Sequence, residues 1–151
     1  MRTRAGIILV EDNKVALIER HRAGLEYYVF PGGGVEEGET PERAAIREAK
    51  EELGVEVAIK QKVAVVHFGL STQIYYLVEQ VGGEFGMGTG EEFVGADPMS
   101  TLKGTYTSVW MTIDELQGHE KVYPADLAGL VLKAQTDGWA KEAIVIVEQP
   151  K

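Results

Sequence analysis

A short segment that carries its own start and stop signals, residues 40–54, most constrains the fold of this chain. Thr40 can accept a hydrogen bond as an N-cap, and Pro41 suits the first helical position, where its missing N–H costs nothing. Gly54 can adopt the left-handed conformation that ends many helices. The sequence therefore predicts a helix from Pro41 to Leu53.

Around this helix, at about 100° per residue, apolar, basic and acidic residues separate into three sectors. The apolar arc consists of Ala45, Ile46, Ala49 and Leu53, and the basic side consists of Arg43, Arg47 and Lys50. The sector between them holds Glu48, Glu51 and Glu52. These glutamates are related as i, i+3 and i+4, so their Cβ atoms are only about 5–6 Å apart.

The acidic sector has two interpretations. A helix of mixed charge is usually a solvated face with ion pairs, and Arg47 with Glu51 would be one such pair. Glu48 and Glu52, however, are like charges one turn apart, which destabilises a helix by roughly a few tenths of a kcal/mol. Three converging carboxylates are better explained as ligands of a hard cation such as Mg²⁺, which prefers oxygen ligands.

The spacing of the residues around this helix resembles the Nudix box, G-x5-E-x7-R-E-U-x-E-E-x-G-U, in which U is a bulky aliphatic residue. The matching positions are Gly33, Glu39 and the continuous run REAKEELGV from Arg47 to Val55. Every fixed glycine and polar position agrees. The one departure is Ala49, which is smaller than the usual aliphatic residue. The pattern covers about a sixth of the chain, and its many fixed positions make it far more specific than a lone short motif.

This resemblance implies a fold and an activity. The fold would be α/β, the Nudix-type α/β/α sandwich with a mixed β-sheet, as a single domain over residues 1–151. The activity would be hydrolysis, dependent on Mg²⁺ or Mn²⁺, of a pyrophosphate bond in a nucleoside diphosphate linked to another moiety, with water as nucleophile. The alternative is a Nudix-fold module that senses such a nucleotide without hydrolysing it. Degenerate modules of that kind would be expected to lose ligand glutamates, and this chain keeps them.

The resemblance also implies the central site residues. Glu48, Glu51 and Glu52 would be catalytic and would bind the metal together with Gly33. Arg47 would be catalytic by orienting these glutamates rather than by touching phosphate.

A second stretch of unusual composition, residues 82–104, is rich in glycine and acids and lacks a sustained apolar period. A loop of this length inside a compact domain is uncommon and is usually functional or mobile. Nudix enzymes often bring an additional acid from outside the box. Glu91 and Glu92 are therefore candidate catalytic residues, and Glu91 is also a candidate metal ligand; the sequence does not choose the base between them.

Two groups of residues near the box are candidates for substrate binding. Arg20 and Arg22 could clamp a phosphate or a terminal sugar, although solvated loop charges are the commoner role of such residues. Gly32, Gly33 and Gly34 allow the backbone to approach a ligand closely or to take positive φ, although a plain turn would use glycine too.

Composition limits the partners of the protein. The chain has 24 acids and 15 bases, a net charge of −9, which disfavours binding to long nucleic acid. A small anionic substrate requires divalent cations to neutralise the acidic site. The absence of cysteine is compatible with a reducing compartment, and we expect a cytoplasmic location. No segment approaches membrane-spanning length, so no membrane partner is expected, and a homodimer would be unsurprising for the family.

The remaining apolar runs alternate with turn residues and predict a set of strands and one further long helix. The strands are expected at residues 4–10, 14–20, 26–30, 55–68, 73–81, 107–113 and 143–147, and the helix at residues 124–136. The first two runs flank the polar turn formed by residues 11–13 and should pair as a hairpin. The runs at 55–68 and 73–81 should form another.

Overall fold

The computed structural model describes residues 2–86 and 105–148, so the expectations for Glu91 and Glu92 lie outside the described residues. Nine strands and three helices form in these ranges: β1 Arg2–Glu11, β2 Lys14–Arg22, β3 Leu25–Val29, β4 Gly32–Gly34, α1 Pro41–Leu53, β5 Val55–Phe68, β6 Ser71–Gly83, β7 Thr105–Thr112, α2 Ile113–Leu116, β8 Val122–Tyr123, α3 Ala125–Asp137 and β9 Ile144–Glu148. Each expected strand and both expected helices are present. The strands β4 and β8 were not predicted.

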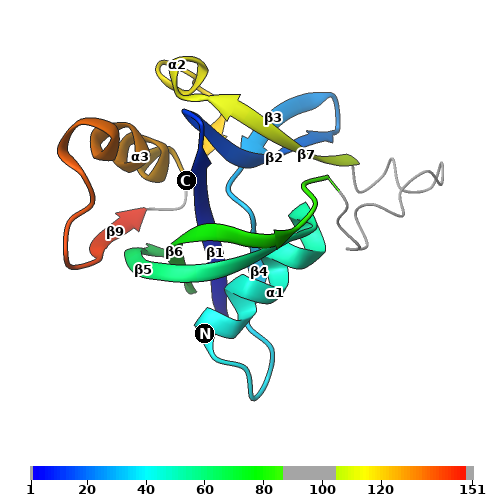
Figure 1. Cartoon of the computed structure of the whole chain (residues 1–151), viewed down its shortest axis with the longest axis vertical. Coiled ribbons are helices and arrows are strands. Elements are labelled where there is room, and N and C mark those ends of the chain that lie inside the picture. The colour runs from blue at the N-terminus through cyan, green and yellow to red at the C-terminus, as the bar shows by residue number, and fades with distance from the viewer. Residues whose placement is uncertain (1, 87–104, 149–151) are drawn as a thin grey trace.

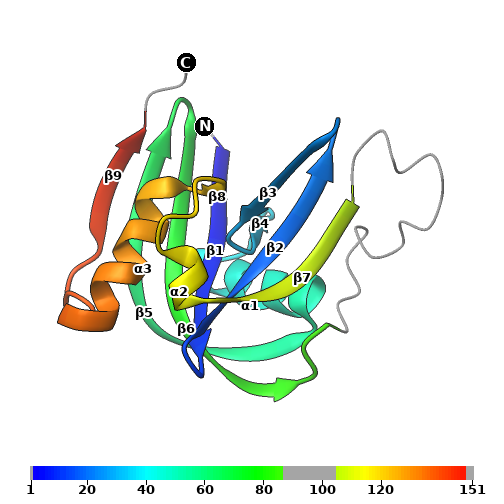
Figure 2. The ribbon, with the colours of Figure 1, turned by 90° about the horizontal axis from the view of Figure 1, so that it is seen from above.

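The strands form one mixed sheet with the path β8-β3-β2-β1-β6-β5-β9, to which β4 adds beside β1 and β7 beside β2. β1 runs parallel to β6 from Arg2↔Ser71 to Leu9↔Val78. It meets β2 only next to the turn, at Val10↔Val15 and Glu11↔Lys14. The predicted hairpin is therefore confirmed at its turn, but beyond it β2, β3 and β7 diverge from β1, β5 and β6 (Figures 1 and 2).

Helices pack on both faces of this sheet, which confirms the predicted α/β/α sandwich. On one face, α1 contributes Ala45, Ala49 and Leu53, all fully buried, to a core shared with β1, β5 and β6. On the other face, Leu127 and Val131 of α3 complete a second core. Burying one such Leu or Val side chain contributes about 1.5–3 kcal/mol. The two cores therefore hold α1 and α3 on opposite faces of the sheet.

The signals that bound α1 act as expected. Thr40 Oγ1 accepts a hydrogen bond from the N–H of Arg43 at 3.2 Å, and Gly54 ends the helix in the left-handed region with φ 81°. One expectation for the helix faces is wrong: Ile46 is 38 % exposed and does not belong to the buried arc. The small Ala49, by contrast, is fully buried, so the departure from the family pattern is accommodated where the helix lies against the sheet.

The glycines at residues 32–34 form a strand, β4, rather than a plain turn. β4 pairs antiparallel with β1 through Arg4↔Gly34, Ala5↔Gly33 and Gly6↔Gly32. None of the three glycines has positive φ, so that part of the expectation is wrong. Gly32 and Gly33 provide close approach, because a Cβ on Gly32 would lie only 2.6 Å from the carbonyl oxygen of Ala5 and one on Gly33 would meet the carboxylate of Glu48, whereas Gly34 has open space.

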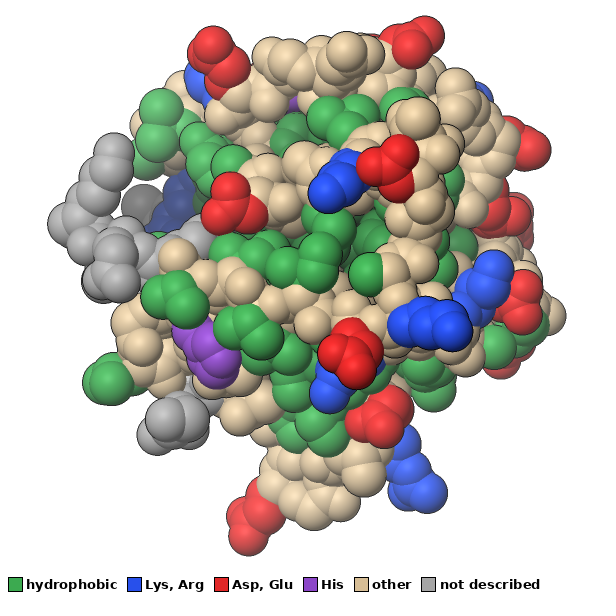
Figure 3. Space-filling model, turned by 90° about the vertical axis from the view of Figure 1, so that its left-hand side faces the viewer, with side chains coloured by type: hydrophobic (Ala, Val, Ile, Leu, Met, Phe, Trp, Pro, Cys, Tyr) green, Lys and Arg blue, Asp and Glu red, His purple; other side chains and the backbone are tan. Residues whose placement is uncertain are grey.

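The far end of the sheet is formed by β9, which pairs only with β5 among the described strands. Val145 and Val147 on this edge strand are each 63 % exposed. Figure 3 shows the face of the molecule on which α3 and β9 lie, where hydrophobic side chains gather in patches between scattered charges. None of the helices in the described ranges has both the length and the hydropathy needed to cross a bilayer.

Candidate active site

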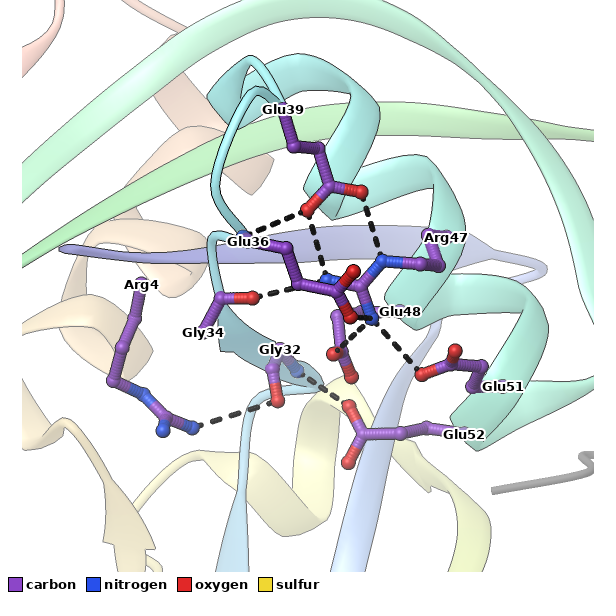
Figure 4. A network of polar contacts seen from close by, with 9 residues as sticks. All are labelled: Arg4, Gly32, Gly34, Glu36, Glu39, Arg47, Glu48, Glu51 and Glu52. Atoms are coloured by element: carbon purple, nitrogen blue, oxygen red, sulfur yellow. Dashed lines mark hydrogen bonds and ion pairs between the residues drawn. The ribbon is translucent and has the colours of Figure 1, made fainter.

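Arg47 is the centre of a polar network on α1 (Figure 4). Its Nε and Nη2 donate to the two carboxylate oxygens of Glu39 at 2.8 and 3.0 Å, and Nη2 also donates to the carbonyl oxygen of Gly34 at 2.9 Å. Its Nη1 donates to Glu48 Oε1 at 2.8 Å and to Glu51 Oε2 at 3.1 Å. The helical wheel placed Arg47 on the basic side, but its long side chain instead reaches across to the acidic sector and the preceding loop.

This network changes the acidity of its members. The pKa of Glu39 is lowered to about 2, chiefly because Arg47 donates hydrogen bonds to its carboxylate and also because the N–H of Glu36 does so. The pKa of Arg47 is raised, chiefly by the hydrogen bond to Glu39. The two side chains are only 24 % and 15 % exposed. They therefore form a charge-assisted bidentate pair, which is the strong kind of ion pair.

Two further glutamates of α1 lie directly against the glycine strand. Glu52 is 6 % exposed, and its Oε1 accepts a hydrogen bond from the N–H of Gly32 at 2.6 Å. The side chain of Glu48 is 13 % exposed, and its carboxylate occupies the space that a Cβ on Gly33 would fill. The lack of side chains on β4 therefore permits both carboxylates to lie next to its backbone.

Glu48 and Glu52 line a pocket of about 710 Å³, a size typical of small-molecule sites. Arg4 of β1, Arg20 of β2 and Tyr106 of β7 line the same pocket. Its walls therefore come from α1, from the glycine strand and from both diverging parts of the sheet. Acidic and basic side chains meet in it, which suits a ligand that carries both phosphate groups and divalent cations.

The chemistry of the α1 glutamates fits a hard divalent cation. Carboxylate oxygens are the ligands that Mg²⁺ prefers, and Glu48 and Glu52 present two largely buried carboxylates one turn apart, of which Glu48 is also paired with Arg47. Nη1 of Arg47 anchors both Glu48 and Glu51, whereas the N–H of Gly32 anchors Glu52. Of the three glutamates, Glu48 and Glu52 line the pocket and Glu51 does not.

A different group has the more compact arrangement of metal-ligating atoms. Within the described part of the chain, Glu19, His21 and Glu26 place one ligand atom each within 4.8 Å of the others. His21 and Glu26 are exposed on the β2–β3 hairpin, and none of the three lines the pocket.

The other sequence candidates have different positions. Arg20 and the three glycines line the pocket, whereas Arg22 is exposed at the end of β2 and does not line it. Arg4 and Tyr106 were missed. They are distant from the box in the sequence, and only the pairing of β1 with β4 and of β7 with β2 brings them to the site.

The protein is an α/β/α sandwich in which carboxylates of the capped helix α1 line a pocket beside the glycine strand β4. This combination defines a narrow class of proteins. A family model described as the NUDIX domain matches residues 1–128, and the chain belongs to the Nudix family.

Curated relatives of this chain carry several names. The ADP-ribose pyrophosphatase of Methanocaldococcus jannaschii is 35% identical over 88 residues, which are 54% of this chain and 52% of that protein. The 8-oxo-dGTP diphosphatase of Haemophilus influenzae is 36% identical over 96 residues, 59% of this chain and 71% of that protein. An RNA pyrophosphohydrolase of Acinetobacter baylyi is 46% identical over 54 residues, 36% of this chain and 32% of that protein. The chain spans about half the length, or less, of the first curated relatives that it matches.

Solved structures agree in fold over nearly the whole chain. A NUDIX hydrolase from Nitrosomonas europaea superposes with a TM-score of 0.72 at 18% identity, covering 97% of this chain and 79% of that one. An ADP-ribose pyrophosphatase from Streptococcus suis has a TM-score of 0.66 at 17% identity, covering 97% and 98%. At these identities the likeness establishes the fold alone.

Proposed function

We propose that this protein is a pyrophosphohydrolase that uses Mg²⁺ or Mn²⁺ and water to cleave a nucleoside diphosphate linked to another moiety. The observation that carries the proposal is the pair of largely buried carboxylates, Glu48 and Glu52, in a pocket that also contains Arg4 and Arg20. Carboxylate oxygens are the ligands that Mg²⁺ prefers, and cations bound to them would in turn hold the phosphate groups of the substrate. The names of the relatives, a pyrophosphatase, a pyrophosphohydrolase and a diphosphatase, support the same chemistry.

The three glutamates and the arginine of the α1 motif each have a proposed role. Glu48, Glu51 and Glu52, with the backbone of Gly33, would hold the cations. When bound, these ions activate a water molecule and offset the charge that develops on the phosphate oxygens. Arg47 positions Glu48 and Glu51 through its Nη1, and the N–H of Gly32 positions Glu52.

The remaining candidates have separate roles in the proposal. Glu91 or Glu92 supplies a carboxylate as general base, and Glu91 alternatively completes the metal shell. Arg20 contacts the substrate beyond the diphosphate, which its place in the pocket supports. Arg22 stays a prediction that the pocket lining does not support.

We also propose a homodimer in the cytoplasm. The exposed valines of the edge strand β9, Val145 and Val147, support self-association, and the absence of cysteine suits a reducing compartment. The net charge of −9 supports a small-molecule partner rather than a long nucleic acid.

Turnover of a nucleotide panel tests the proposal. ADP-ribose, nucleotide sugars, dinucleoside polyphosphates and damaged nucleoside triphosphates would be incubated with enzyme and Mg²⁺, and the nucleotide and phosphate products quantified. We expect at least one compound to be cleaved, with Glu51→Gln and Glu52→Gln each lowering kcat by about 100-fold or more. Glu37→Gln, in an exposed position of the 35–40 loop, is the matched control and should leave turnover unchanged. Tight binding without turnover would instead identify a nucleotide-sensing module.

A further inference from the structure

Arg20 is a cation in the pocket that has no acidic partner among the described residues. On the sheet it lies directly between Tyr27 of β3 and Tyr106 of β7. Its guanidinium carbon is 4.1 Å from the ring centroid of Tyr106 and 5.7 Å from that of Tyr27. Its Nε is buried and makes no hydrogen bond with the described residues.

This arrangement is unusual in a chain with 24 acids and 15 bases. Stacking on tyrosine contributes about 0.5–2 kcal/mol and fixes the plane of the guanidinium. It does not satisfy the N–H donors in that plane, and a buried donor without a partner costs about 1–3 kcal/mol. The two Nη atoms of Arg20 also make no hydrogen bond with the described residues, so a ligand in the pocket with acceptors in the plane of the guanidinium would pair with them.

The pocket is lined by aromatic as well as cationic side chains. Tyr123 of β8, whose ring centroid is 6.2 Å from that of Tyr27, lines it and is 46 % exposed. Phe68 at the end of β5, in the other part of the sheet, also lines it and is 42 % exposed. Exposed aromatic faces inside a pocket are surfaces on which a planar ring can stack. A phosphate group would also accept hydrogen bonds from Arg20, but it gains nothing from these faces.

We infer that Arg20 reads the nucleobase of the substrate by donating two parallel hydrogen bonds to one edge of a stacked purine, and that it thereby selects guanine. Guanine presents two adjacent acceptors, O6 and N7, which match the donor fork of arginine. Adenine presents N7 next to an N6 amino donor, which a guanidinium cannot pair with. The inference rests on the proposed function, because the diphosphate of the same nucleotide is placed at the α1 glutamates.

Equilibrium binding of non-hydrolysable nucleotides tests the inference independently of turnover. The α,β-methylene diphosphates of guanosine, inosine and adenosine would be titrated calorimetrically in Mg²⁺. Inosine keeps O6 and N7 but lacks the 2-amino group, so it should bind as tightly as guanosine. Both should bind roughly 5- to 100-fold more tightly than adenosine, the range of one bidentate base contact.

Three variants assign the selectivity to the arginine fork. Arg20→Met keeps most of the stem and Arg20→Lys keeps the charge. Both should nevertheless reduce the ratio of the affinity for the guanosine nucleotide to that for the adenosine nucleotide to within about twofold of one. Arg43→Met removes an exposed charge from α1 and should preserve the ratio. Melting temperatures measured in parallel show that each variant is folded.

Several results would overturn the inference. One is a guanosine-to-adenosine affinity ratio near one in the unaltered protein, and another is a ratio that Arg20→Lys retains. A third is an equally weaker binding of all three nucleotides by Arg20→Met, which would assign Arg20 to phosphate. Hydrolysis without base preference would reject the inference and leave the proposed function intact. Guanine-selective binding without hydrolysis of any nucleotide would reject the proposed function and leave the role of Arg20 intact.

Discussion

Replacing Glu39 by Gln should destabilise the fold through the loss of its ion pair with Arg47. The Glu39 carboxylate accepts two hydrogen bonds from Arg47, its side chain is 15 % exposed, and its pKa is lowered from 4.5 to about 2. At about 1.36 kcal/mol per pKa unit, that lowering sets an upper limit of about 3 kcal/mol at neutral pH. Solvent screening in a surface loop reduces the expected loss to about 1–2 kcal/mol.

The pH dependence of this loss identifies its cause. Because the pKa of Glu39 is lower in the folded state than in the unfolded state, its contribution is fully present above about pH 5 and disappears as the pH falls from 4.5 towards 2. Urea unfolding of the unaltered protein and of Glu39→Gln at pH 7, 5, 3.5 and 2.5, about the range set by these pKa values, measures the difference. The exposed Glu37→Gln is the control. A difference that is the same at pH 3.5 and pH 7, or absent at pH 7, would refute the reasoning.

Three further substitutions test the packing around the site. Gly33→Ala should lower kcat/KM by about 10-fold or more because its Cβ would displace the Glu48 carboxylate. Gly129→Ala, on α3 and away from the pocket lining, has open space for a Cβ and should change kcat/KM less than about twofold; equal effects would contradict this. Leu53→Ala removes a fully buried side chain and should cost about 2–5 kcal/mol of unfolding free energy, and a loss below about 1 kcal/mol would show that the core there is not tightly packed. Gly54→Ala places a Cβ at φ 81° and should cost about 1–2 kcal/mol, while an unchanged denaturation midpoint would argue against the left-handed cap.

Local signals in the sequence were sufficient for the elements that contain them. The bounds of α1 follow from Thr40, Pro41 and Gly54, each of which acts within one turn of the helix end. The β5–β6 hairpin likewise forms from adjacent runs joined by a short turn. The spacing of the glutamates predicted that all three converge; Glu48 and Glu52 line one pocket, whereas Glu51 does not line it.

Features that depend on distant pairing were not accessible from the sequence. The β1–β2 hairpin was expected to continue, but β1 pairs with β6, more than sixty residues away, and no local pattern specifies that partner. Two other long-range pairings, of β1 with β4 and of β2 with β7, bring Arg4 and Tyr106 to the pocket. The expected pairing of Arg47 with Glu51 is present, although the helical wheel put Arg47 on the basic side. The wheel fixes only the Cβ, whereas the direction of a long side chain is decided by its partners, here also Glu39 and Gly34.

Titration of Mn²⁺ followed by electron paramagnetic resonance tests the central claim most directly, since it reads metal binding at the α1 carboxylates without substrate. The unaltered protein and the Glu37→Gln control should bind Mn²⁺ with the same affinity, and Glu52→Gln should bind at least about 10-fold more weakly or lose a site. His21→Ala, which removes a ligand from the compact group on the β2–β3 hairpin, should leave the titration unchanged. A titration unaffected by Glu52→Gln but abolished by His21→Ala would place the metal away from α1 and contradict the account.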